Sequence, residues 1–232
     1  MARTFSVEEI YQILETEIVD LKLLPGAMIS ENLCCQRFGI SRTPVRSVLQ
    51  RLEQNGFVRI VPHKGTVVTA INVDIVNQMI YQRVAVETAV LRDFVRSAPP
   101  LAVERVRCAL QRLQSVGDVV GDPAQFDIYR FLREDLAMHR IWFEMTEKGY
   151  LWQRLIAPHP DYSRFIRLDI IGAQNVSEVL RHHAEMMRII DEKDLDAIEP
   201  LIKEHLYGGV RRLSGKLYGP EAGRYADYFR QG

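Results

Sequence analysis

The sequence lacks long apolar runs and contains little cysteine. No stretch approaches the roughly 20 apolar residues that a membrane-spanning helix needs. The opening MARTFSVEEIYQ turns acidic without the apolar segment of a secretion signal. We therefore expect a cytoplasmic protein that is not associated with a membrane. The three cysteines, Cys34, Cys35 and Cys108, form no CxxC pair, which argues against a disulfide framework, a zinc finger and a thioredoxin-like redox site.

The chain also lacks an excess of charge of either sign, because 30 basic residues balance 30 acidic ones. A neutral chain is not expected to coat nucleic acid through bulk charge. Basic residues are nevertheless concentrated between positions 37 and 64, where the single acid Glu53 stands against Arg37, Arg42, Arg46, Arg51, Arg59 and Lys64. This local excess indicates one surface for an anionic partner.

Hydrophobic spacing and chain breakers predict a winged helix-turn-helix in the first 72 residues. Apolar residues at helical spacing, Pro25-Gly26, Gly39 and Asn55-Gly56 delimit three helices, and two short β-branched runs flank a turn. The expected elements are helices over 7–21, 33–38 and 41–55, strands over 57–61 and 66–69, and a turn over 62–65. Helix, helix, turn, helix and hairpin is the order of the winged helix-turn-helix.

In such a motif, the second helix of the pair lies in the major groove and reads DNA through its N-terminal residues. Arg42 and Arg46 are four residues apart and project from one face. Arginine suits bidentate contact with guanine, or contact with phosphate. The predicted DNA contacts are Ser41, Arg42, Thr43 and Arg46 on the helix, with His63, Lys64 and Gly65 in the wing.

The stretch LLPGAMISENLCCQRFGISRTPVRSVLQRLEQNGFVRIVPHKGTVV resembles the DNA-binding domain of the GntR family of bacterial regulators. The SRTPVR core, the glycine turn and the K-G-T wing carry the resemblance. This chain departs from the family pattern with Ser47 in place of glutamate, and with Cys34 and Cys35 in place of small residues. The resemblance implies a regulator that binds double-stranded operator DNA.

After Ala70 the sequence shows helical patterns and no strand signal. We expect helices over 73–97, 101–116, 125–146, 150–171 (interrupted by prolines), 176–191 and 195–217, the last kinked or shifted at Pro200. The fold class is therefore mostly α, with an N-terminal winged helix-turn-helix over 1–72 and a C-terminal all-helical bundle over 73–232 that acts as an effector domain.

Ionisable residues interrupt the apolar stripes of three of these helices. Asp135 and His139 share one stripe, and His183 and His205 each lie on another. Buried ionisable groups are costly unless they are paired or bind a metal. One carboxylate and three imidazoles suit a divalent cation, zinc first, with nickel or manganese as alternatives. The sequence therefore predicts a metal site made of Asp135, His139, His183 and His205.

The helical part resembles the FCD-type effector domain of the same family, of the FadR-like subfamily. The resemblance rests on D-L-A-M-H at 135–139, on His183 and His205, and on an R-x-x-x-E pattern at Arg83 and Glu87. It implies that Arg83 and Glu87 bind an effector, although an i,i+4 salt bridge would also explain this pair. A metal beside an inward arginine would suit a small organic acid. His159, Arg164 and Arg167 are weaker effector candidates, because prolines leave the helix phase undefined there.

The expected protein is thus a metabolite-responsive transcriptional regulator, not an enzyme. A homodimer would match a roughly palindromic operator, since twofold protein symmetry fits twofold site symmetry. Two alternatives stay open. The metal would be purely structural in a ligand-independent regulator, or it would activate water in a metal-dependent hydrolase. The hydrolase would leave the winged helix-turn-helix unexplained, and no general base or nucleophile is evident.

Overall fold

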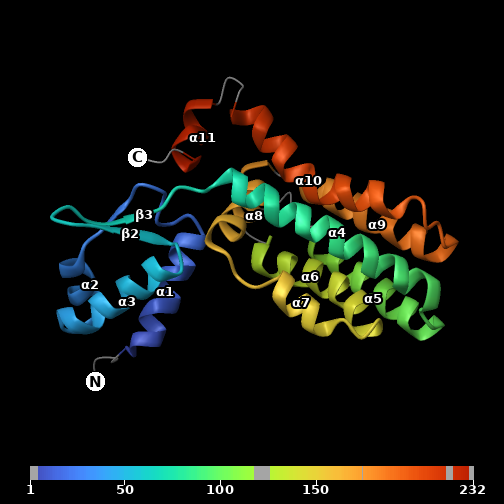
Figure 1. The fold of residues 1–232 in the computed structure, drawn as a ribbon, viewed down its shortest axis with the longest axis horizontal. Helices are drawn as coiled ribbons and strands as arrows, with labels where there is room; N and C mark the ends of the chain where they lie inside the picture. Colours follow the sequence, from blue (N-terminus) through green and yellow to red (C-terminus); the bar gives the residue numbers. More distant parts are fainter. Residues whose placement is uncertain (1–4, 118–125, 174, 218–221, 230–232) are drawn as a thin grey trace. The chain divides into compact units, whose positions relative to one another are not determined.

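The computed structural model describes residues 5–117, 126–173, 175–217 and 222–229, and Figure 1 shows the order of their elements. The chain forms two compact units. Unit 1 comprises residues 1–76, 158–168 and 214–232, and unit 2 comprises residues 77–157 and 169–213. No helix in the described ranges is long and apolar enough to span a membrane.

Unit 1 contains the winged helix-turn-helix. Its elements are α1 (Val7–Val19), β1 (Met28–Ile29), α2 (Glu31–Phe38), α3 (Arg42–Gln54), β2 (Val58–Val61) and β3 (Gly65–Val68). The three strands form an antiparallel sheet in the order β1-β3-β2, with Met28 opposite Val67 and Val61 opposite Gly65. The predicted helices and hairpin are confirmed. The two-residue strand β1 was not predicted, because two residues are too few to show alternation.

Local signals explain where the helices of unit 1 begin and end. A capping box between Ser6 and Glu9 starts α1, and the Ser30 hydroxyl accepts the Leu33 N–H at the start of α2. Gly39 ends α2 with a left-handed φ of 66°. Ser41 precedes α3 as predicted, but its side chain makes no capping hydrogen bond. The inward faces of α1 and α3 supply much of the apolar core, with Ile10, Leu14, Ile18, Val48, Leu49 and Leu52 all at most 2% exposed.

The first part of α8 (Pro160–Ala173) belongs to unit 1. The Arg164 guanidinium is fully buried and donates to the carbonyl oxygens of Thr69, Ala70 and Pro160. One turn later, Arg167 forms a buried ion pair with Asp20, the C-cap of α1, at 2.6 Å. Both arginines were weaker effector candidates, and the structure places them as buried anchors of α8 within unit 1.

Unit 2 is helical. Its elements are most of α4 (Val73–Ser97), α5 (Pro100–Gly117), α6 (Ile128–Met145), α7 (Gly149–Leu155), α9 (Val176–Glu192) and most of α10 (Ile198–Leu217). Helix α5 packs against both α6 and α9 (Figure 1). The predicted interruption near 158–160 separates α7 from α8. Pro200 lies in the first turn of α10, where proline is tolerated, so that this helix starts at Ile198 instead of Leu195. Helix α11 (Ala222–Phe229) was not predicted.

Candidate metal centre and nucleic-acid interface

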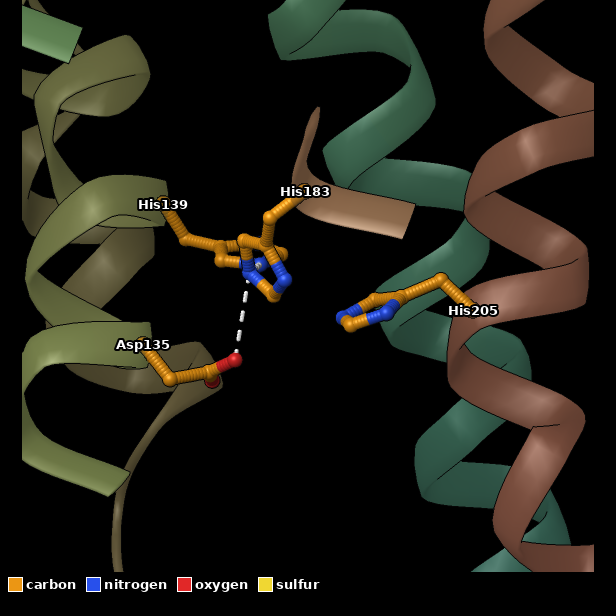
Figure 2. A group of neighbouring side chains, drawn as sticks. All are labelled: Asp135, His139, His183 and His205. Carbon is orange, nitrogen blue, oxygen red and sulfur yellow. Dashed lines mark hydrogen bonds and ion pairs between the residues drawn. The ribbon is translucent and has the colours of Figure 1, made fainter. Parts of the chain in front are cut away.

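Four side chains from three helices of unit 2 converge on one point. Asp135 and His139 come from α6, His183 from α9 and His205 from α10, as Figure 2 shows. One potential ligand atom from each lies within 4.8 Å of the others. The imidazoles of His139 and His183 are fully buried. These are the four residues that were predicted because they interrupt the apolar stripes of their helices, and their cluster could hold a metal ion.

Hydrogen bonds fix which ring nitrogens of two histidines face the centre. The Nδ1 atom of His183 lies 2.8 Å from the carbonyl oxygen of Val179, which can only accept, so this nitrogen carries a proton. The Nδ1 atom of His139 lies 2.5 Å from Oε2 of Glu87 and donates to that carboxylate. With Nδ1 protonated in each ring, the two Nε2 atoms face inward, 3.1 Å apart, and each offers a lone pair to a metal when its ring is neutral.

The charges around the cluster favour a cation at its centre. Burial would raise the pKa of Asp135 and lower that of His183, but the ion pair between Asp135 Oδ1 and His183 Nε2, 3.1 Å apart, outweighs burial in both: it holds the pKa of Asp135 well below its usual range and raises the pKa of His183. A metal bound by His183 would displace the proton that Nε2 carries in this ion pair. Burial, together with His183 and His139, lowers the pKa of His205 well below its ordinary value. The cluster therefore presents an ionised carboxylate and a neutral His205.

Two geometric observations fit a metal ion. Nitrogens bound to one zinc at about 2.0–2.1 Å lie roughly 2.8–3.4 Å apart for angles between a right angle and the tetrahedral one, a range that includes the observed Nε2 separation. The Nδ1 atom of His205 is buried and has no hydrogen-bond partner among the described residues. A buried nitrogen without a partner is costly, and coordination of the ring to a metal is one way to recover that cost.

The predicted effector residues Arg83 and Glu87 lie next to this cluster in a salt bridge. Arg83 Nε is 2.6 Å from Glu87 Oε1, and both side chains are buried on α4. Burial opposes the ionisation of Glu87, but Arg83 and His139 outweigh it and lower the pKa of this carboxyl. The contact between Glu87 and His139 was not predicted. In the sequence, only the inward position of Glu87 on its helix pointed to this contact, because Glu87 and His139 are 52 positions apart.

The third predicted effector residue, His159, is not part of the cluster. It precedes α8 in a segment of unit 1, whereas the four cluster residues belong to unit 2. Its Nδ1 atom accepts the backbone N–H of Asp161 at 3.3 Å, and its side chain is 35% exposed. His182, next to His183, is buried but turns toward Glu204 at 3.2 Å. His159 and His182 are therefore not members of the ligand set.

The predicted DNA-contacting residues are all exposed on unit 1. Ser41, Arg42, Thr43 and Arg46 lie at or near the N-terminus of α3. His63 and Lys64 lie in the turn between β2 and β3, and Gly65 is the first residue of β3. His63 and Gly65 have positive φ angles of 62° and 116°. This backbone conformation accounts for the glycine in the wing, since other residues adopt it at a cost.

The local basic excess is smaller in the structure than in the sequence. Glutamates on α1 and α2 pair with three of the six basic residues, joining Arg37 to Glu17, Arg46 to Glu31 and Arg51 to Glu8. The sequence could not show this, because the acids lie 15 to 43 positions away. Within the described residues, Arg42 and Lys64 form no ion pair.

Two family models match this chain. The model of the bacterial regulatory proteins of the gntR family matches residues 6–68, and that of the FCD domain matches residues 78–208. The HTH-type transcriptional repressor RspR of Escherichia coli K12 is 26% identical over 201 residues, covering 86% of this chain and 85% of that protein. An HTH-type transcriptional regulator of Streptomyces ambofaciens is 28% identical over 216 residues, covering 92% and 87%.

Solved structures of low sequence identity share the fold. A GntR-type regulator from Rhodococcus sp. RHA1 has a TM-score of 0.63 at 19% identity, covering 90% of this chain and 97% of that one. McbR/YncC of E. coli has a TM-score of 0.59 at 17% identity, covering 92% and 99%. The chain belongs to the GntR family and is a DNA-binding transcriptional regulator, not an enzyme, with an N-terminal winged helix-turn-helix and a C-terminal FCD domain.

Proposed function

We propose that this regulator responds to a small organic acid that binds at a metal held by Asp135, His139, His183 and His205. The observation that carries the proposal is the pair of inward Nε2 atoms, 3.1 Å apart, whose rings donate outward to Glu87 and to the Val179 carbonyl. Two lone pairs facing each other at this distance repel unless a proton or a metal cation lies between them, and a metal bound by both rings would take the place of that proton. Zinc is the proposed ion, because three imidazoles and one carboxylate are ligands that it accepts readily.

A metal in this place would supply a Lewis-acidic point that attracts a carboxylate. Asp135 would contribute one negative charge and the three histidines none, so the site would retain positive charge for an anionic ligand. Arg83, at the edge of the cluster, would provide a second cationic group, with Glu87 and His159 as the other proposed effector residues. A ligand that binds the two regulatory states unequally would shift DNA affinity by about 1–3 kcal/mol.

On the DNA side, we propose that Ser41, Arg42, Thr43 and Arg46 enter the major groove, while His63, Lys64 and Gly65 contact the backbone or minor groove. The reading domain would comprise residues 1–72 and the sensing domain residues 73–232. A cytoplasmic homodimer would present two reading heads to a roughly palindromic operator. A stoichiometry of two chains per operator in sedimentation experiments is the expected result.

A purely structural metal is the second candidate, and one observation favours it. Arg83 is buried and its Nε is engaged by Glu87, so a ligand could reach this guanidinium only by entering the helical core. In that case the metal would clamp α6, α9 and α10 together without reporting any metabolite. The two candidates agree on the ligands and differ only in the response to organic acids.

The decisive experiment is a thermal-shift screen on the full-length protein, loaded with zinc or stripped by a chelator. Loading should raise the melting temperature, since a ligand at 100 times its Kd stabilises by about 2.7 kcal/mol. Under the sensing proposal, at least one mono-, di- or tricarboxylic acid raises it further in the loaded protein only and alters operator binding. A zinc-dependent shift without any acid-dependent shift supports the structural metal, and no zinc-dependent shift contradicts both.

A further inference from the structure

The winged helix-turn-helix, called here the reading head, contains three arginine–glutamate pairs that differ in which edge of the guanidinium contacts the glutamate. Arg37 turns its terminal Nη1 and Nη2 atoms onto Glu17, at 2.8 and 2.5 Å. Arg51 likewise turns both Nη atoms onto Glu8. Arg46 instead binds Glu31 through Nε, which lies 3.1 Å from each carboxylate oxygen. In Arg37 and Arg51, the Nη1–Nη2 edge of the guanidinium, called here the forked edge, is thus occupied by a glutamate. Arg46 is held through Nε instead.

This difference leaves the forked edge of Arg46 available. Among the described residues, no hydrogen bond engages its Nη1 or Nη2 atom, and its side chain is 61% exposed. The Nη1–Nη2 edge is one that can bind guanine O6 and N7, or two phosphate oxygens, in bidentate fashion. Glu31 therefore restrains the guanidinium without using the atoms that DNA would need.

Glu31 is well placed to act as a fixed support. It is the first residue of α2, directly after the N-cap Ser30, and the first turn of a helix favours a carboxylate. Its side chain is 36% exposed, and Arg46 lies on the neighbouring helix α3. An arginine side chain loses rotamer freedom when it binds, so a support that orders it beforehand lowers that loss.

We infer that Glu31 is a positioning residue for DNA reading, which holds Arg46 so that its Nη1–Nη2 edge faces the major groove. The inference rests on the proposed reading role of Arg46. It predicts that Glu31 increases sequence discrimination, although removing a negative charge from a DNA-binding surface would otherwise strengthen binding to any duplex.

The test is a double-mutant cycle on the full-length protein. One probe is a 30-base-pair duplex selected from a random library by the wild-type protein, and the other is a scrambled duplex of equal composition. Fluorescence anisotropy, at two salt concentrations, measures the affinity of each variant for the selected and the scrambled duplex. Glu31→Ala should lower the ratio of selected to scrambled affinity by roughly 5- to 10-fold. Glu31→Gln should keep most of the ratio, because the amide oxygen still accepts from Nε. Adding Glu31→Ala to Arg46→Ala should change the ratio no further.

The matched control is Glu17→Ala, which frees the forked edge of Arg37 and should leave the ratio unchanged. If Arg46→Ala leaves the ratio intact, the reading role of Arg46 fails and the inference falls with it. If Arg46→Ala lowers the ratio but Glu31→Ala does not, the inference alone is overturned. It is also overturned if Glu31→Ala strengthens binding to both duplexes equally, or still lowers the ratio in the Arg46→Ala background.

Discussion

His139 and His183 face each other through Nε2 atoms 3.1 Å apart, while their Nδ1 atoms are tied to Glu87 and to the Val179 carbonyl oxygen. Both rings are therefore held in the tautomer that a metal ligand requires, before any ion binds. Such an arrangement lowers the ordering cost of binding. The hydrogen bonds from the two Nδ1 atoms to Glu87 and Val179 should therefore affect metal affinity, and substitutions can test this.

Replacing His183 and His205 with alanine should abolish metal binding, because two of the four donors are lost. Elemental analysis of purified, folded protein measures the metal content directly. His182→Ala is the matched control, since this buried neighbour bonds Glu204 and lies outside the cluster. A double variant that keeps its full metal complement would place the site elsewhere in the chain. Asp135→Asn, which changes the shape least, should weaken binding without unfolding the protein.

Glu87→Gln should weaken metal affinity about 10- to 100-fold, although Glu87 is not one of the four ligands. The amide can still accept from His139 Nδ1, but it carries no charge to favour the bound ring or to balance Arg83. Competition with a chelator of known affinity measures the change. Glu144→Gln, an exposed acid on the same helix as His139, should have no effect. Equal metal affinity in both variants would refute the supporting role of Glu87.

Arg167→Ala should destabilise unit 1 by about 1.5–3 kcal/mol, because the buried Asp20 loses its charged partner at 2.6 Å while the exposed Lys22 stays 3.4 Å away. Differential scanning calorimetry should show a clearly lower transition temperature. Arg37→Ala removes an exposed ion pair from the same unit, and surface pairs contribute little, so its transition should hardly move. Equal shifts in the two variants would show that burial does not increase the contribution of the Asp20–Arg167 pair to the stability of unit 1.

Gly65→Ala should destabilise the wing and weaken DNA binding. Its φ of 116° disfavours any side chain, and an added Cβ would lie 2.8 Å from the Cε atom of Met28. We expect a cost of about 1–3 kcal/mol, measured by thermal melting, together with weaker binding to the selected duplex. Gly149→Ala, where an added Cβ meets nothing within 4 Å, should be neutral or slightly stabilising. Wild-type melting and DNA binding in Gly65→Ala would contradict this account of the wing.

The sequence predicted the cluster residues because helical geometry is local. Asp135 and His139 are four residues apart, so they share a face on any helix, and the apolar stripes around His183 and His205 gave their phase. Convergence of the three helices followed only from the cost of burying ionisable groups. Contacts that join distant segments left no such pattern. The bond from His139 to Glu87 and the pairing of Arg46 with Glu31 are therefore known only from the structure.

Sequence reasoning was weakest for α8. The prolines at 158 and 160 obscured its phase, so Arg164 and Arg167 were placed only as weaker effector candidates. Both side chains are in fact buried, since carbonyl oxygens and Asp20 supply their partners. An apolar stripe gave the inward position of Arg83, but no such stripe was available around Arg164 and Arg167, and their burial depends on acceptors from other parts of the chain.

Helix α8 also limits how such a protein can be recombined. Its residues up to 168 belong to unit 1 and the rest to unit 2, so no single peptide bond separates the reading head from the sensor. A fragment ending at residue 72 would lose the Arg164 and Arg167 anchors and leave Asp20 without its arginine. A chimera that grafts this head onto another sensor would therefore have to carry residues 158–168 along, although they lie some 85 positions further along the chain.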